Sequence, residues 1–298
     1  MNLTAYSVAF LAILIIGNAS AEEASADQIK EMISDGALNL STYAYVRDAD
    51  ASILYSNSSI EAEFQASKVT QGMVNLTSQE GWWEAKLTAT GREESLGWEG
   101  YFVNGSEYWK EGDNWTEFII DDPASIMADY NEMPGQANLV NLSAMELLGT
   151  EICDGEECYV LSGTPPEPVL QRMLGVQLLA AFYPSPFTMP AELGDEDEEV
   201  LDISNLMNNS SIEITAWISK DFGLLKRLDI NSSLVMTPEM LGISPLEFRI
   251  ESTLNESTTY SQCGSSIEIE LPPEALEGVT YRTEGTDWRW MVFGTIKP

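Results

Sequence analysis

The side chains best suited to chemistry are three cysteines and many carboxylates, in a chain of 298 residues without histidine. Cys153 and Cys158 bracket the sequence DGEE, and Asp154-Gly155 is a turn signal. We therefore expect a tight hairpin in which the two thiols face each other, and in an exported protein such a pair forms a disulfide. Cys263 is left over, either buried or paired with another molecule.

Without histidine, the chain cannot build a Ser-His-Asp triad, a Cys-His pair or a histidine-based metal site. Carboxylates could form a glycosidase pair, but among 48 acids no pair is singled out by its spacing. The acids outnumber 14 basic residues and give a formal charge of -34, which repels phosphate backbones. We predict no catalytic residues, no metal, no cofactor and no nucleic-acid partner.

The first 21 residues have the pattern of a secretory signal peptide. The apolar run Val8–Ile16 is too short to span a bilayer comfortably, and Ala19-Ser20-Ala21 is a small-x-small cleavage site. No Lys or Arg precedes the run, so an uncleaved anchor is the alternative. We expect residues 22–298 to form one extracytoplasmic domain, secreted or at the cell surface.

Asn-x-Ser/Thr sequons support export, because several fall at expected turns where a glycan can point into solvent. Asn208 and Asn209 are adjacent, so we expect only one of them to be modified. The glycosylation candidates are Asn39, Asn57, Asn75, Asn104, Asn114, Asn141, Asn208, Asn209, Asn231 and Asn255.

Alternating apolar and polar residues predict antiparallel strands with one buried face. The segments with this pattern are 43–55 (with a bend at 48–50), 60–67, 82–90, 211–219, 246–254 and 266–271, followed by an apolar strand at 288–294. Apolar residues at helical spacing predict helices. The helical segments are 22–36, which Gly36 ends, 123–133, 143–149 and 165–187. The pattern indicates an α+β fold built on a large antiparallel sheet.

The stretch YFVNGSEYWKEGDNWTEF combines six aromatic residues with two turns. Asn104-Gly105 predicts a two-residue type I′ hairpin, because both residues tolerate positive φ. This register pairs Tyr101 with Tyr108 and lays an indole over Gly100, which it pairs with Trp109. Because aromatic residues occupy both faces, we expect a meander that is partly covered on both sides.

Four segments resemble the LolA/LppX-like family of extracytoplasmic lipoprotein carriers and lipid-binding lipoproteins. They are YFVNGSEYWKEGDNWTEF, LLGTEICDGEECYVLSGTP, ITAWISKDFGLLKRLDI and TTYSQCGSSIEIELPPEA, in the family's order. The resemblance implies a half-open β-barrel whose concave face is covered by helices, with acyl chains taken up between them. This chain departs from the family because it lacks a lipobox cysteine and carries dense sequons.

The leading hypothesis is a secreted carrier or sensor that holds a lipid or another hydrophobic molecule between sheet and helices. The alternative is a cell-envelope glycoprotein with a closed core that binds another envelope protein. Alternation and helical spacing select the cavity candidates, although a shift of one residue in register would turn the strand residues outward. These candidates are Phe64, Leu87, Leu170, Met173, Leu174, Leu178, Phe182, Phe248 and Ile250.

Overall fold

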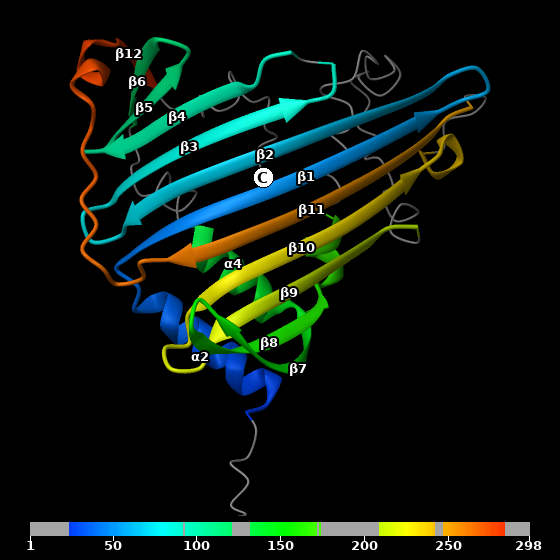
Figure 1. Cartoon of the computed structure of the whole chain (residues 1–298), viewed down its shortest axis with the longest axis horizontal. Coiled ribbons are helices and arrows are strands. Elements are labelled where there is room, and N and C mark those ends of the chain that lie inside the picture. The colour runs from blue at the N-terminus through cyan, green and yellow to red at the C-terminus, as the bar shows by residue number, and fades with distance from the viewer. Residues whose placement is uncertain are drawn as a thin grey trace, which may run out of the picture.

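A computed structural model describes residues 24–91, 93–120, 132–171, 173, 209–241 and 247–283. In this part of the chain one twelve-stranded sheet forms an open half-barrel with few helices (Figure 1), which confirms the expected α+β class. The strand order is β12-β6-β5-β4-β3-β2-β1-β11-β10-β9-β8-β7, so β12 and β7 are the edges. β12 runs parallel to β6, and the other neighbouring pairs are antiparallel.

The strands are β1 (Thr42–Ser56), β2 (Glu61–Asn75), β3 (Glu80–Ala89), β4 (Leu96–Val103), β5 (Ser106–Glu111), β6 (Asn114–Ile120), β7 (Ala144–Cys153), β8 (Glu156–Thr164), β9 (Ser211–Ser219), β10 (Leu225–Met236), β11 (Arg249–Ser261) and β12 (Val279–Thr283). The helices are α2 (Ala26–Leu38) and α4 (Glu132–Leu142), with short 3₁₀ turns η3 (Pro238–Leu241) and η4 (Pro273–Glu277). No helix in the described segments is both long and apolar enough to cross a membrane.

Helix α2 begins with a capping box in which the side chains of Ser25 and Gln28 each accept a bond from the other's backbone N–H. It buries Ile29 and Ile33 at helical spacing, as the sequence predicts. The helix does not end at Gly36 as expected but continues to Leu38. Gly36 instead allows the helix to approach the turn at Gly223. A Cβ on Gly36 would lie only 2.6 Å from the carbonyl oxygen of Gly223.

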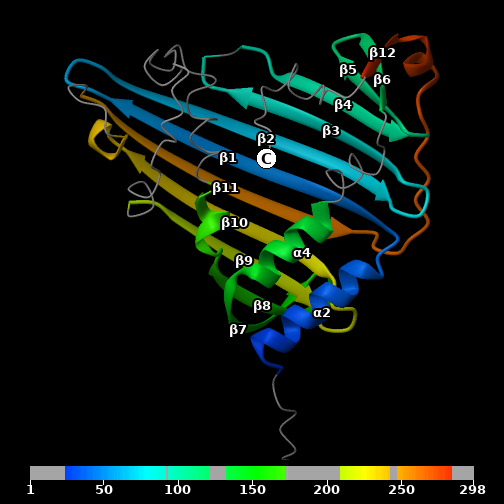
Figure 2. The same ribbon diagram turned by 180° about the vertical axis from the view of Figure 1, so that it is seen from behind.

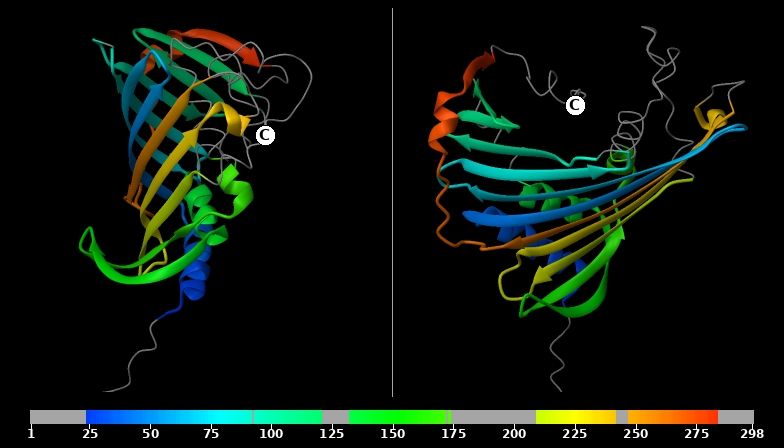
Figure 3. Two further views of the ribbon diagram at one scale, coloured as in Figure 1. Left: turned by 90° about the vertical axis from the view of Figure 1, so that its right-hand side faces the viewer. Right: turned by 45° about the horizontal axis from the view of Figure 1, so that its top comes forward.

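The sheet has an inner face, defined as the one on which α2 and α4 lie (Figure 2), and an outer face opposite it. The side views show the open, curved sheet with these helices to one side (Figure 3). Directly paired residues share a face, so the register assigns every strand residue to one face. Tyr43, Val74 and Tyr260 lie on the inner face and are fully buried in the main core.

The aromatic meander has the predicted register, with Tyr101 opposite Tyr108 and Gly100 opposite Trp109. Asn104 and Gly105 have φ of 55° and 77°, as a type I′ turn requires. The ring lying over Gly100 is, however, that of Trp83 on β3, where a Cβ on the glycine would come within 2.5 Å of the indole. The prediction of an indole over this glycine is correct, but the indole comes from the other neighbouring strand.

A second core covers the outer face of the meander. Tyr101, Tyr108 and Trp115 are buried there together with Ile267 and Ile269. The sequence predicts a strand at 266–271, but in the structure these residues form no strand. Their alternation still predicts burial correctly, because an extended segment laid across a sheet turns every second side chain toward it. On the opposite face of the meander, Phe102 is buried in the main core, so the meander is covered in part on both sides, as expected.

Two further sequence predictions are wrong. Residues 143–149 were expected to form a helix, but the segment from Ala144 forms strand β7, paired with β8. Helical propensity is a weak prior that tertiary pairing overrides. The register shifts between Leu147 and Gly149, whose φ is 142°. The bend expected at residues 48–50 is absent, because β1 continues through them between two long neighbours.

Several predictions fall outside the described residues and stay predictions. They are the signal peptide and most of the helix at 123–133, together with the strand at 288–294. Strand β12 was not expected from the sequence, because only its parallel pairing with β6 makes it a strand.

Candidate functional site

The four predicted wall residues on the sheet side lie on the inner face. Phe64 is paired with Ile53, and Ile250 with Tyr55. Leu87 is opposite Lys68 in the next row. Phe248 lies just before β11, and its ring stacks on that of Tyr55, with centroids 6.5 Å apart. The expected facing is therefore correct at all four positions.

On the helix side, residues 167–171 and 173 are helical. Leu170 and Met173 pack, partly buried, against the main core. The other three helix candidates, Leu174, Leu178 and Phe182, lie outside the described residues. The structure therefore brings part of the predicted helix to the same core as two of the wall residues, Ile250 and Phe248.

An alanine floor on the inner face was missed at the sequence level. We use this name for the half-buried residues Ala49, Ala51, Ala62, Ala66 and Ala89. Ala51, Ala66 and Ala89 form one row across three adjacent strands. A row of methyl groups leaves more space above a sheet than a row of larger side chains. The alternation of alanine with aspartate in RDADAS could have identified the beginning of the floor.

At one end of the alanine floor, Arg47 joins the sheet to α4. Its Nη2 lies 2.8 Å from Glu132 Oε1, and its Nε lies 3.3 Å from Glu256 Oε1. Burial raises the pKa of the Glu132 carboxyl above its usual range, and the Arg47 charge only partly opposes this. Burial alone would lower the pKa of Arg47, but the two carboxylates outweigh it and the net direction is upward. Within the described residues, no group of three or more carboxylates or cysteines could hold a metal ion.

Next to the ion pairs, α4 is fixed by neutral hydrogen bonds. The Tyr260 hydroxyl donates to Gln136 Oε1 at 2.7 Å, and Gln136 Nε2 donates to Thr258 Oγ1 at 3.2 Å. The backbone N–H of Met133 donates to the Tyr43 hydroxyl at 3.4 Å. Because these polar groups are buried and satisfied, they fix the position of the helix on the sheet.

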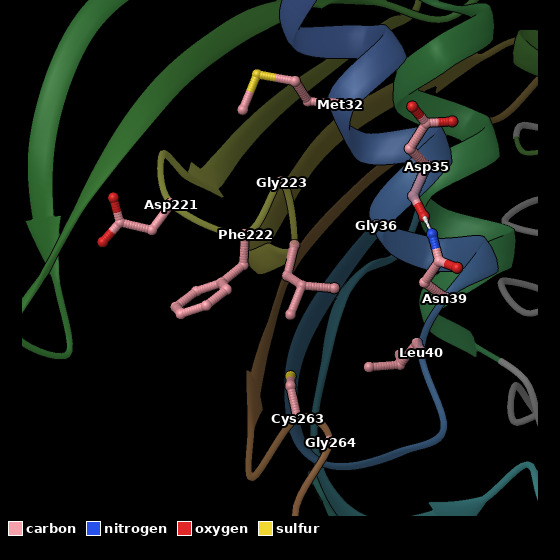
Figure 4. Close-up of a pocket in the computed structure, with 11 residues that line it drawn as sticks. Met32, Asp35, Gly36, Asn39, Leu40, Asp221, Phe222, Gly223, Cys263 and Gly264 are labelled. Carbon is pink, nitrogen blue, oxygen red and sulfur yellow. Dashed lines mark hydrogen bonds between the residues drawn. The ribbon is translucent and has the colours of Figure 1, made fainter.

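A separate hollow of about 420 Å³ lies where α2 meets the β9–β10 turn (Figure 4). Its wall mixes apolar residues such as Met32 and Leu40 with acids such as Asp35 and Asp221. It lies beside the close approach of Gly36 and Gly223, and it contains none of the predicted cavity residues.

Cys153 and Cys158 lie on the same face of the hairpin but not directly opposite each other, and both are free thiols in the structure. The two-residue turn at Asp154-Gly155 pairs Cys153 with Glu156, so Cys158 is its diagonal neighbour. Diagonal positions are farther apart than directly opposite ones, although here the thiols remain in hydrogen-bond contact. Burial and this contact raise the pKa of the Cys158 thiol to about 12. Cys263 is half-buried and also free.

Nine of the ten sequon asparagines lie in the described segments, and Asn208 does not. Those that are exposed are Asn39, Asn104, Asn114, Asn141, Asn209, Asn231 and Asn255. Asn57 and Asn75 are half-buried, and the side-chain amide of each donates a hydrogen bond within the protein.

No family model and no curated protein match the chain. Among solved structures, it is similar to LprF from Mycobacterium bovis, with 16% identity and a TM-score of 0.43 over 83% of this chain and 96% of that one. It is similar to LppX from Mycobacterium tuberculosis, with 15% identity and a TM-score of 0.37 over 82% and 98%. A LolA-superfamily protein from Nitrosomonas europaea matches with 11% identity and a TM-score of 0.21 over 84% and 96%.

Proposed function

We propose that this protein is a secreted glycoprotein that binds the acyl chain of a lipid, or another hydrophobic ligand, on the inner face of its sheet. The observation that carries the proposal is the alanine floor beside Phe64, Ile53 and Tyr55. These side chains are half-buried, although they lie on the same face as a fully buried core. An apolar surface with small side chains at its centre suits a long, flexible hydrocarbon.

Hydrophobic burial alone can hold such a ligand in place, without a catalytic group or a covalent bond. Burial gains about 0.8 kcal/mol for each methylene, so a long acyl chain gains on the order of 10 kcal/mol in total. Immobilising the ligand and ordering side chains remove a good part of this. The remainder is consistent with a carrier that takes up its ligand and later releases it.

The test has two parts. Organic extracts of protein purified from its native host should contain a stoichiometric lipid by mass spectrometry. After that lipid is removed, the neutral fluorescent probe N-phenylnaphthylamine should bind saturably, and added lipid should displace it. Stripped protein that is folded but binds no apolar probe would rule out the carrier function.

A second candidate function is binding of another envelope protein. Leu148 and Ile152 are 65% and 71% exposed on β7, which is an edge of the sheet. An edge strand presents unpaired backbone groups that can accept a partner's strand. If this is the function, a Leu148→Ser/Ile152→Ser variant will lose the partner in a pull-down from envelope extracts, while its probe binding stays unchanged.

A further inference from the structure

The inner face is almost uncharged where the alanine floor lies, although the chain as a whole has a formal charge of -34. On the inner-facing positions of β1, β2 and β3, the charged side chains are two cations, Arg47 and Lys68. The carboxylates of these three strands lie instead on their outer-facing positions. An anion that reaches these three strands on the inner face therefore meets none of the carboxylates that the strands themselves carry.

The two cations differ in how they are paired. Arg47 is held by Glu132 and Glu256, as described above. Lys68 forms no ion pair with any residue that the structure describes, and its side chain is exposed. Partial desolvation, followed by repulsion from Arg47, lowers the pKa of its ammonium group. A ligand anion would stabilise the charged ammonium and so oppose both effects on its pKa.

The position of Lys68 relative to the floor gives the ligand a direction. Lys68 is paired with Ala49 in one row, and the next row toward the β1–β2 hairpin joins Ala51 to Ala66. The last row pairs Tyr55 with Ala62. The six residue steps along β2 from Lys68 to Ala62 span roughly 20 Å, at about 3.3 Å for each step. An extended acyl chain of that length would have its polar end at Lys68.

We propose that Lys68 binds the monoanionic head group of a single-chain amphiphile, either a carboxylate or a phosphodiester, whose tail lies along the alanine floor. This inference rests on the proposed function and specifies the ligand class of that same site. Glu132 and Glu256 stay on Arg47, so Arg47, Lys68 and the two glutamates together carry no net charge before the ligand arrives. A monoanion is therefore favoured over a dianion, which the two nearby carboxylates would repel.

The test compares three ligands as displacers of N-phenylnaphthylamine from stripped protein. Palmitate carries a carboxylate, lysophosphatidylglycerol carries a monoanionic phosphodiester, and hexadecanol is neutral. At least one anionic ligand should bind about tenfold more tightly than hexadecanol, which corresponds to about 1.4 kcal/mol. The anionic ligand that binds more tightly shows whether the site prefers a carboxylate or a phosphodiester head group.

Lys68→Met keeps a side chain of similar length but removes the charge. It should abolish the preference for anionic ligands without weakening the binding of hexadecanol. Lys68→Arg should retain the preference. Lys86→Met is the matched control, because Lys86 lies on the outer face of the neighbouring strand. Equal binding of all three ligands to the wild type, or an unchanged preference in Lys68→Met, would overturn the inference and leave the carrier function standing. If no ligand displaces the probe, the proposed function itself fails.

Discussion

Gly36 of α2 lies against Gly223 of the β9–β10 turn so closely that a Cβ on Gly36 would lie 2.6 Å from the Gly223 carbonyl oxygen (Figure 4). Gly223 has a φ of 64°, and a Cβ added there would in turn lie 2.5 Å from the carbonyl oxygen of Met32. Both glycines therefore serve a close backbone approach that joins α2 to the sheet.

Gly36→Ala should destabilise the protein by about 1–3 kcal/mol, because the obstacle is backbone that cannot rotate away. Gly135→Ala in α4 is the control, since nothing lies within 4 Å of a Cβ there. It should stabilise the protein by about 0.5–1 kcal/mol through helix propensity. Thermal unfolding of both variants checks the pair, and equal effects in the same direction would contradict the close-approach argument.

Arg47→Met should destabilise the protein by about 1–3 kcal/mol, because it leaves the Glu132 carboxylate without its cation. Adding Glu132→Gln should recover part of the loss, since the buried charge is then gone. Denaturant unfolding of the two single variants and the double variant measures the coupling. If the losses in free energy of unfolding are strictly additive, the 2.8 Å ion pair between Arg47 and Glu132 contributes nothing to stability.

The stability deficit of Arg47→Met should depend on pH. The folded pKa of Glu132 is raised above its ordinary value of 4.5, so the folded state holds this proton more tightly than the unfolded state. Stability therefore falls as the pH rises from 4.5 through the folded pKa. Loss of Arg47 raises that pKa further. The loss of stability in Arg47→Met, measured by thermal unfolding, should therefore be smaller at about pH 5 than at about pH 7. A deficit that is constant or larger at the lower pH would argue against this assignment.

In protein reduced beforehand, Cys158 should be alkylated much more slowly than Cys153. Its side chain is fully buried, and its pKa of about 12 leaves almost no thiolate near neutral pH. Timed alkylation followed by peptide mapping gives the order. In the exported protein without reduction, we still predict a linked pair, so neither thiol should react. Rapid labelling of both would refute the disulfide.

Among the sequons, glycan occupancy at Asn75 should be low compared with Asn104 and Asn114. The amide nitrogen of Asn75 donates to the Ile267 carbonyl at 3.0 Å, and its oxygen accepts from two backbone N–H groups of the following turn. Asn104 and Asn114 are exposed at turns of the meander. Glycopeptide mapping of the native protein measures occupancy, and a fully occupied Asn75 would contradict the hydrogen-bonded geometry.

Ala66→Trp should block probe binding while the fold survives, because the indole would occupy the space above the alanine floor. Ser67→Trp is the matched control, since the next residue of the same strand points to the outer face. Probe titration and thermal unfolding are measured for both variants. If the floor is ordinary core, Ala66→Trp will instead cost about 1–3 kcal/mol by overpacking.

The sequence by itself determined the features that depend on neighbours along the chain. Alternation assigned Phe64, Leu87 and Ile250 to one face, because successive side chains of a strand point in opposite directions. Asn104-Gly105 fixed the hairpin register, since positive φ at both positions selects the two-residue turn. The same reasoning placed the cysteine turn at Asp154-Gly155, and only the diagonal position of Cys158 was missed.

The tertiary structure decided what depends on partners far along the chain. The segment at 144–153 has helix-compatible residues, but pairing with β8 makes it a strand, whereas 266–271 has strand alternation and packs on the outer face without pairing. Arg47 and Lys68 look alike in sequence, and only the fold gives Arg47 two carboxylates and leaves Lys68 facing the alanine floor. Periodicity shows which side of a helix or strand is apolar. Which other part of the chain packs against that side depends on the fold of the whole chain.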